Sequence, residues 1–360
     1  AIPTMSRRLY YALLLLIFMQ TIWSEQSDSD SNDDDNGTCD AADGCDNDND
    51  VVTDHLEHIW KLPKNYDCEN ERNDKDCEYW KSNTNACNNN AGFMILQCPK
   101  SCGFCHLKDP KVRCSRHPKA KAAVGVGDVD KMFNRLLTDF PQYSPEVLSS
   151  PNSKENPGPW LVVLNDVFTD EECDTLVRIG GRNFRRSVDA GKMKGDGAKF
   201  EEIVSDARTS STDWCTRDCW NNPIIQQIAA KAENITMIPR ENSEYFQVLR
   251  YEVGQYYVQH HDYIYGHLDL PIGPRVYTFF VYLNNPEEGG GTRFNNLDVT
   301  VQPKKGSVAI WPSVLNEDPY KKEHRTNHEA LPVEEGVKYG ANMWLHMYNF
   351  HDPYKVTCTG

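Results

Sequence analysis

The chain has 360 residues, which is enough for two domains with linkers, and 53 acidic against 38 basic residues give it a net charge of −15. An acidic chain without an obvious basic cluster lacks the positively charged surface that contacts a phosphate backbone, so we exclude nucleic-acid binding.

The chain begins with a possible targeting segment. Residues 7–23 start with Arg7 and Arg8 and continue as a run of mostly apolar residues. This pattern is typical of a secretory signal, although a membrane span, which needs about 20 apolar residues, is only slightly longer. We therefore expect residues 1–24 to be a signal peptide or a signal anchor that delivers the rest of the chain to an oxidising lumen.

Residues 25–60 carry much of the acidic excess and few apolar side chains. Such a stretch buries too little surface to offset chain entropy, so we expect a disordered linker. The chain's 13 cysteines fit a compartment in which disulfides form. Asn36 and Asn234 begin Asn-X-Thr patterns, which are weak signals for glycosylation in that compartment.

Six cysteines lie between Cys68 and Cys105. A segment this short cannot build an independent apolar core, so it needs covalent cross-links. Six cysteines permit fifteen pairings, and their spacing does not choose among them. Zinc binding is the alternative, but Cys102 and Cys105 form the only C-x2-C pair. We expect disulfides.

This segment resembles the ShK toxin-like domain, through Asp74, the Cys77–Trp80 spacing and the ending "CPKSCGFC". The resemblance implies a module at residues 66–106 with the pairs Cys68–Cys105, Cys77–Cys98 and Cys87–Cys102. The Lys-Tyr pair with which the toxins block channels is absent, because the stretch before Cys98 reads "NNAGFMILQ". We expect the module to bind a protein or to act as a spacer.

The sequence after the cysteine module predicts a linker and one larger domain. Residues 107–156 form a linker with a helix at 128–140, and a strand follows at 160–164. Thr169 and Glu172 form a capping box for a helix that ends at Gly180, and a second helix covers 221–236. Strand patterns follow at 245–253, 275–285, 297–303, 306–312 and 339–350. This order predicts an α+β fold, with helices packed on an antiparallel sandwich or barrel.

The stretch "YEVGQYYVQHHDYIYGH" concentrates histidines. In an extended strand, His260 and Asp262 share a face about 6.6 Å apart, while His261 points to the other face. One more histidine would complete a facial triad, which leaves three coordination positions open on Fe(II). A bare H-x-D pattern is more often an ordinary surface pair, so context has to decide.

Two downstream residues supply that context. His328 can provide the second imidazole, and Lys338 begins a strand in which Gly340, Asn342 and Trp344 share its face. A lysine inside a barrel is costly without an anion, and a dicarboxylate that also chelates the metal would supply one. Taken alone, Lys338 would more often be a solvated lysine at a strand end.

Four stretches of the larger domain carry a second resemblance: "RYEVGQYYVQHHD", "YLNNPEEGGGTRF", "VQPKKGSVAIW" and "NHEALPVEEGVKYGANMWLH". Through them, residues 157–352 resemble the prolyl 4-hydroxylase branch of the Fe(II)/2-oxoglutarate dioxygenases. It implies a double-stranded β-helix (jelly roll) with flanking helices. It also implies Fe(II) ligands His260, Asp262 and His328, Lys338 for the C5 carboxylate of 2-oxoglutarate, Tyr251, Thr292 and Trp344 around the cosubstrate, and Arg275 near the peptide substrate.

The activity that the resemblance implies is 4-hydroxylation of peptidyl proline with Fe(II), 2-oxoglutarate and O2, with release of succinate and CO2. Ascorbate would keep the iron reduced. The acceptor would be a proline-rich extended segment. We expect the enzyme in the lumen of the endoplasmic reticulum, or on an ER or Golgi membrane with its catalytic domain in the lumen. Secretion from the cell is the other possible location. The alternatives are hydroxylation of another residue such as lysine, and a secreted binding or toxin-like protein that acts through the cysteine module.

Other residues carry weaker expectations. We expect His261 to pack or to face solvent. His267 lies in a following loop and either takes part in covering the substrate or has an ordinary structural role. His346 is expected to pack in the core or to form a hydrogen bond rather than to bind metal. Tyr256, Tyr257, Tyr263 and Tyr265 either stack on a substrate or belong to the core. Cys215 and Cys219 form a disulfide or flank a substrate groove, and Cys173 and Cys358 pair or remain free.

Overall fold

The computed structural model describes residues 55–62, 67–155, 157–194 and 199–360. The expectations for the signal segment and for the acidic stretch up to residue 54 lie outside these residues. Within the described ranges, no helix has both the length and the apolar character that crossing a membrane requires.

The cysteine module is a cluster of short helices. Its disulfides join Cys68 to Cys105, Cys77 to Cys98 and Cys87 to Cys102, which are the pairs that the resemblance implied. The half-cystines Cys77 and Cys98 are fully buried and lie in one core with Met94 and Ile95. The helices are α3 (Asp74–Thr84), α4 (Ala86–Asn89), α5 (Ala91–Gln97) and α6 (Pro99–Cys102).

Helix α2 (His55–Trp60) corrects the expected end of the disordered linker at residue 60. Leu56 and Ile59 are buried in the core of the cysteine module. These two residues lie three positions apart and therefore share one helix face. They supply the apolar surface that the acidic stretch before them lacks, so the helix packs.

The C-terminal tail is part of the same core. Val356 and Cys358 are fully buried among the module's apolar residues. Cys358 forms a disulfide with Cys114, which lies 244 positions earlier in the chain. The possible pair Cys173–Cys358 is therefore wrong, and Cys173 is a buried free cysteine. Around this junction lie η1 (Cys105–Leu107), α7 (Pro110–Arg113) and α11 (His351–Lys355).

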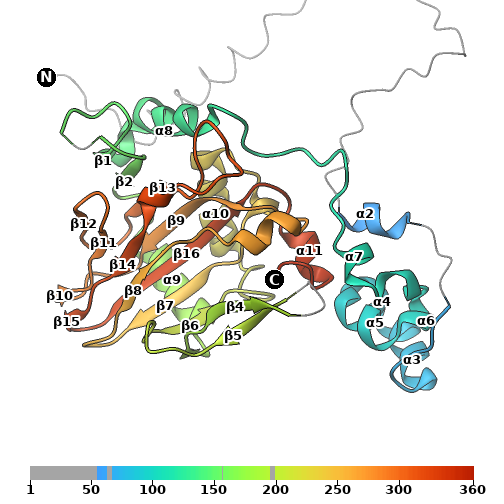
Figure 1. Cartoon of the computed structure of the whole chain (residues 1–360). Coiled ribbons are helices and arrows are strands. Elements are labelled where there is room, and N and C mark those ends of the chain that lie inside the picture. The colour runs from blue at the N-terminus through green and yellow to red at the C-terminus, as the bar shows by residue number, and fades with distance from the viewer. Residues whose placement is uncertain (1–54, 63–66, 156, 195–198) are drawn as a thin grey trace, which may run out of the picture. The chain divides into compact units, whose positions relative to one another are not determined.

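Two large antiparallel sheets form the framework of the larger domain (Figure 1), and two further sheets of the described residues have two strands each. The larger sheet has the order β1-β2-β13-β9-β16-β7-β6-β3, and the smaller one β12-β11-β14-β8. The strands of the larger sheet, in that order, are Glu146–Ser149, Leu161–Leu164, Val308–Pro312, Arg275–Tyr282, Lys338–His346, Gln247–Tyr251, Ser211–Trp214 and Arg185–Arg186. Those of the smaller sheet are Val299–Val301, Thr292–Phe294, His328–Ala330 and Tyr257–His260.

One apolar core joins the two sheets, and it includes Phe280 and Trp311 of the larger sheet and Phe294 of the smaller one. A second core lies between the other face of the larger sheet and the helices, where Val248 and Phe279 pack against Leu176. This layering of helices, large sheet and small sheet is the expected jelly roll with flanking helices. The helices are α8 (Asp128–Asp139), α9 (Asp170–Gly180) and α10 (Pro223–Thr236).

The local signals in the sequence placed these helices well. The capping box of α9 is present, with the Thr169 hydroxyl accepting from the Glu172 amide and the Glu172 carboxylate accepting from the Thr169 amide. Gly180 is the last helical residue rather than the stop, and Gly181 is the cap. The Asn222 side chain caps α10 by accepting from the Ile224 amide.

Several short elements were not predicted. β3 to β6 lie between α9 and α10, a stretch for which the sequence analysis predicted no element, and β4 (Asp189–Met193) and β5 (Phe200–Ile203) form a separate hairpin. The sequences of these two strands lack the apolar alternation that marks a half-buried strand, so the pattern did not predict them. In agreement, neither strand has a buried residue. The remaining elements are β10 (Glu288–Gly289), β15 (Val333–Glu335), η2 (Pro141–Tyr143), η3 (Arg240–Asn242), η4 (Tyr265–Asp269) and η5 (His324–Thr326).

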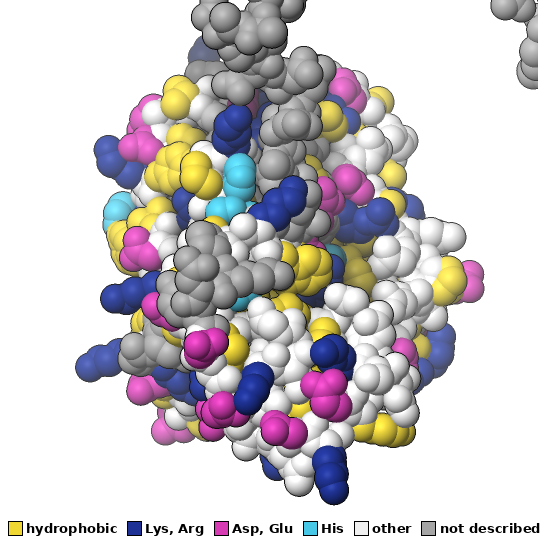
Figure 2. Space-filling view, turned by 90° about the vertical axis from the view of Figure 1, so that its right-hand side faces the viewer, with side chains coloured by type: hydrophobic (Ala, Val, Ile, Leu, Met, Phe, Trp, Pro, Cys, Tyr) yellow, Lys and Arg dark blue, Asp and Glu magenta, His cyan; other side chains and the backbone are white. Residues whose placement is uncertain are grey.

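Figure 2 shows one face of the molecule with its side chains coloured by type. Where grey atoms leave the surface visible, Lys and Arg side chains are interspersed with Asp and Glu and form no continuous patch of one sign.

Candidate metal centre

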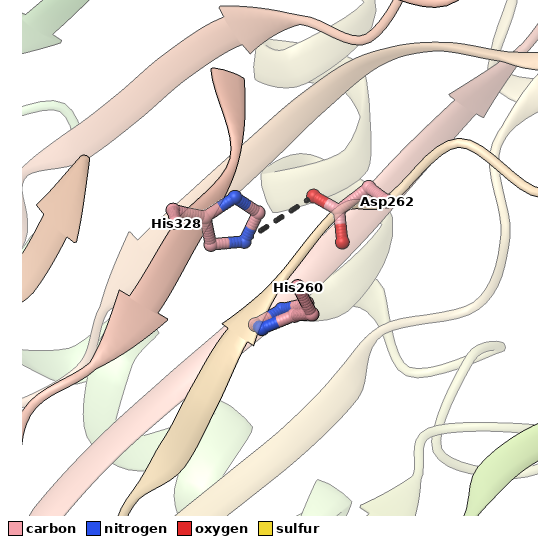
Figure 3. Close-up of side chains that lie close together, drawn as sticks. All are labelled: His260, Asp262 and His328. Atoms are coloured by element: carbon pink, nitrogen blue, oxygen red, sulfur yellow. Dashed lines mark ion pairs between the residues drawn. The ribbon is translucent and has the colours of Figure 1, made fainter. Parts of the chain in front are cut away.

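Strand pairing brings the three predicted ligands together. β14 pairs with β8 so that His328 lies opposite His260, and Asp262 follows two residues after the end of β8. One ligand atom from each of the three side chains lies within 4.8 Å of the others. Figure 3 shows the three side chains grouped together. Asp262 therefore lies in a loop and not, as was expected, in a strand. Its side chain still points toward the same space as that of His260.

Hydrogen bonds orient both imidazoles. Nδ1 of His260 lies 2.9 Å from the Val258 carbonyl oxygen, and Nδ1 of His328 lies 3.0 Å from that of Thr326. A carbonyl oxygen only accepts, so each Nδ1 carries the proton and each Nε2 keeps its lone pair. Both rings are thus prepared to bind a metal ion through Nε2.

Asp262 is 4% exposed and is held as a carboxylate. Burial by itself would raise its pKa, but His328, His260 and Arg275 outweigh burial and lower the pKa to about 2. The Thr278 hydroxyl donates to Oδ2 over 2.6 Å. His328 Nε2 lies 3.7 Å from the same oxygen. Two imidazoles and one carboxylate whose ligand atoms converge are the donor set that suits Fe(II) with open coordination positions.

The same cavity contains the buried end of Lys338. Lys338 is 1% exposed, and its Nζ has no hydrogen-bond partner among the described residues. The rings of Tyr251, Phe280 and Tyr282 lie 5.4, 5.6 and 5.7 Å from this nitrogen. Burial lowers the pKa of Lys338 to about 7. A buried ammonium without a counter-ion fits a site that receives an anion.

Of the expected cosubstrate residues, Tyr251 and Thr292 line this cavity together with His260, His328 and Lys338. The Tyr282 hydroxyl donates to Thr292 Oγ1 over 2.9 Å, which orients the threonine. Trp344 is not among the lining residues.

Trp344 lies instead beside Arg275, whose guanidinium carbon is 3.7 Å from the centre of its ring. Arg275 Nε donates to Glu244 over 2.6 Å, and a second nitrogen of Arg275 lies 3.3 Å from the Asp262 carbonyl oxygen. His346 is fully buried, with Nδ1 3.0 Å from the Gly273 carbonyl oxygen and Nε2 2.9 Å from Glu244.

Glu244 is therefore the centre of a buried charged network. Burial by itself would raise its pKa, but Arg275 and His346 lower it to about 2. Sequence reasoning missed Glu244, because its partners lie about 30 and 100 positions away along the chain and nothing local marks it.

Tyr257 contacts a predicted metal ligand directly. Its ring stacks on that of His260, with centres 3.6 Å apart, and its hydroxyl donates to Asp189 over 2.9 Å. Arg208, which is 5% exposed, lies 4.8 Å from the Tyr257 ring and donates to Gln247 over 2.9 Å. The sequence named Tyr257 only as a stacking or core residue and did not identify Arg208.

Several other residues singled out by the sequence contact residues other than the three ligands. His261 donates through Nε2 to the Glu323 carbonyl oxygen over 2.7 Å, and its Nδ1 accepts from the Tyr263 amide. His267 is buried beside the rings of Phe200 and His346. Tyr263 belongs to the apolar core, whereas Tyr265 is 60% exposed.

A larger cavity lies elsewhere and contains none of the predicted site residues. Its volume is about 240 Å³, and its lining includes Arg116, Met237, Pro271 and Tyr348. It has no cluster of metal-ligating side chains, so size alone is a poor guide to the site in this fold.

Comparisons with known proteins agree with this geometry. The family model described as the 2OG-Fe(II) oxygenase superfamily matches residues 246–346, and the ShK domain-like model matches residues 67–105. Prolyl 4-hydroxylase 2 of Arabidopsis thaliana is 32% identical over 252 residues, which cover 61% of this chain and 80% of that protein. Prolyl 4-hydroxylase subunit alpha-2 of Gallus gallus is 27% identical over 208 residues, covering 56% of this chain and 37% of that protein.

Among solved structures, the viral collagen prolyl hydroxylase of Paramecium Bursaria Chlorella virus-1, in its 2OG complex, is 29% identical to this chain. The match covers 52% of this chain and 95% of that one, with a TM-score of 0.40.

Proposed function

Because this chain belongs to the prolyl 4-hydroxylase family, we propose that it hydroxylates peptidyl proline at C4 and releases succinate and CO2. The observation that carries the proposal is one cavity in which His260, His328 and the unpartnered ammonium of Lys338 lie together. Such a cavity accommodates a metal ion at one end and an anionic group at the other.

His260, Asp262 and His328 would hold Fe(II), each through the atom that its hydrogen bonds leave free. When bound, Fe(II) with 2-oxoglutarate and O2 supplies the oxidising power for a C–H bond that side chains alone cannot attack. The residues of this chain contribute orientation. Thr278 holds the Asp262 carboxylate, and Arg275 holds its backbone through the carbonyl oxygen.

Lys338 would pair with the far carboxylate of 2-oxoglutarate. Its aromatic surroundings exclude water, and the Tyr251 and Thr292 side chains lie in the same cavity, where their hydroxyl groups are suited to bind that carboxylate. The charged pair would form only when the cosubstrate is present, which explains an ammonium buried without a partner. Glu244 pairs with Arg275 and His346, and this network would hold Arg275 in its stacked position on Trp344. These side chains would form the part of the site that faces the peptide.

The cellular setting is also a proposal. Five disulfides in the described part of the chain support an oxidising compartment, and the lumen of the secretory pathway fits best. There, ascorbate would keep the iron reduced, residues 7–23 would target or anchor the chain, and Asn234 on the exposed side of α10 would be available for glycosylation. The cysteine module would bind a protein partner or act as a spacer.

The test uses the chain with its cysteine module, since the module and the C-terminal tail share one core. The protein is incubated with Fe(II), 2-oxoglutarate, ascorbate and proline-rich peptides, and the products are identified by mass spectrometry. We expect a gain of about 16 Da on proline, matched by succinate release. The same gain on lysine would show that another residue is the acceptor, and no succinate with any peptide would favour a binding protein.

A further inference from the structure

Trp214, the last residue of β6, lies in a row of side chains that leads to the cavity. Trp214 is opposite Gln247 of β7, Gln247 is opposite Asn342 of β16, and Asn342 is opposite Phe280 of β9. Residues directly opposite one another in neighbouring strands project to the same face of a sheet. Asn342 and Phe280 line the cavity, so Trp214 is at the outer end of the surface that forms its wall.

The indole of Trp214 is the exposed part of this wall. Its ring centre lies 6.2 Å from that of Trp344, which in turn stacks on Arg275. Trp344 is 5% exposed, whereas Trp214 is 42% exposed. The neighbouring strand β3 pairs only with Ser211 and Thr212 and ends before Trp214, so no described strand continues the sheet beside it.

A disulfide holds the chain that follows this tryptophan. Cys215 is fully buried and bonded to Cys219, which closes the turn after β6. Within the turn, the Thr216 amide donates to the Trp214 carbonyl oxygen over 2.8 Å, and the Cys215 amide donates to the Phe246 carbonyl oxygen over 2.9 Å. The backbone of Trp214 is thus fixed on both sides of a half-exposed aromatic ring.

We propose that Trp214 is a specificity-determining residue that binds a proline of the acceptor next to the one that is oxidised. This inference rests on the proposed function. A proline-rich segment in the polyproline II conformation exposes its rings along its sides, and aromatic side chains bind such rings with little loss of ligand entropy. An indole on a fixed backbone at the rim of the cavity offers this contact, and the Cys215–Cys219 disulfide holds that backbone in place.

The test compares Trp214→Ala, Trp214→Phe and the wild type in steady-state kinetics with a short polyproline peptide. We expect Trp214→Ala to raise the peptide KM about tenfold, a change typical of one lost aromatic contact, and Trp214→Phe to recover most of it. The KM for 2-oxoglutarate and the slow succinate release without peptide should not change, because both depend on the inner cavity. Tyr79→Ala, which truncates an even more exposed aromatic side chain on α3, is the control and should match the wild type.

A peptide KM in Trp214→Ala within twofold of the wild-type value would overturn the proposal, provided that the wild type hydroxylates the peptide. If the wild type releases no succinate with any peptide, the proposed function itself fails, so the two failures are distinguishable. The double variant Cys215→Ser/Cys219→Ser should also raise the peptide KM without altering the KM for 2-oxoglutarate. An unchanged peptide KM in this variant would show that the disulfide does not position Trp214.

Discussion

Lys338 begins strand β16 opposite Tyr251 of β7, and its ammonium nitrogen lies 5.4 Å from the centre of the Tyr251 ring. No described hydrogen-bond acceptor reaches that nitrogen, although Lys338 is 1% exposed. The fold thus carries a destabilising buried cation at the place where the proposed function needs one. Stability and activity should therefore respond in opposite directions when it is removed.

Lys338→Met should stabilise the ligand-free protein while abolishing turnover. Methionine keeps the length of the side chain and removes a buried charge without a partner, so we expect a gain of about 1–3 kcal/mol in the free energy of unfolding. Turnover should be lost, because the far carboxylate of 2-oxoglutarate would have no cation to pair with. Chemical denaturation and succinate release measure the two effects, and a less stable variant would contradict this account of Lys338.

Lys338 should also make the stability of the ligand-free protein depend on pH. Its pKa falls from 10.5 to about 7 on folding, so the unfolded chain binds more protons between these values. The free energy of unfolding should therefore rise with pH across this window, by up to about 1.4 kcal/mol per pH unit from this group, relative to Lys338→Met. Denaturation curves at several pH values test this.

The control for this pH dependence is saturating 2-oxoglutarate in the presence of the metal. The bound carboxylate should keep Lys338 charged across the window, which removes the difference in slope between the two proteins. A slope that persists with ligand would mean that another group titrates.

His328→Ala should abolish turnover, whereas His261→Ala should retain most of it. His328 presents Nε2 to the candidate metal centre, while both nitrogens of His261 are engaged in structural hydrogen bonds. We expect His261→Ala to cost about 1 kcal/mol in stability through the lost bond to Glu323. Equal loss of activity in two equally well-folded variants would show that the ligand assignment is wrong.

The Cys114–Cys358 disulfide should stabilise the junction between the cysteine module and the C-terminal tail. The double variant Cys114→Ala/Cys358→Ala should lose roughly 2–4 kcal/mol, because the disulfide constrains a long stretch of the unfolded chain. Limited proteolysis should cut the tail of this variant first. Cys173→Ala, which removes the free buried cysteine, is the control and should leave the tail resistant.

The sequence was informative where the physics is local. The capping box at Thr169 and Glu172, the side-chain periodicity of α8 and α10, and the cysteine-rich segment each depend on residues close together in the chain. The convergence of His260 and Asp262 also follows from their spacing, even though the strand ends at His260. The clustering of the three candidate ligands was therefore foreseeable from the motif and the family resemblance together.

Contacts between distant segments were not foreseeable. Glu244 meets Arg275 and His346, Cys114 meets Cys358, and Trp214 reaches Trp344, and in each case strand order and register bring the partners together. A lone charged, sulfur or aromatic residue carries no local mark of its partner, because its environment depends on which segments pack beside it. Short-range pattern thus specified the helices, the cysteine module and the ligand motif, whereas long-range packing alone decided the buried network, the covalent junction and the rim of the cavity.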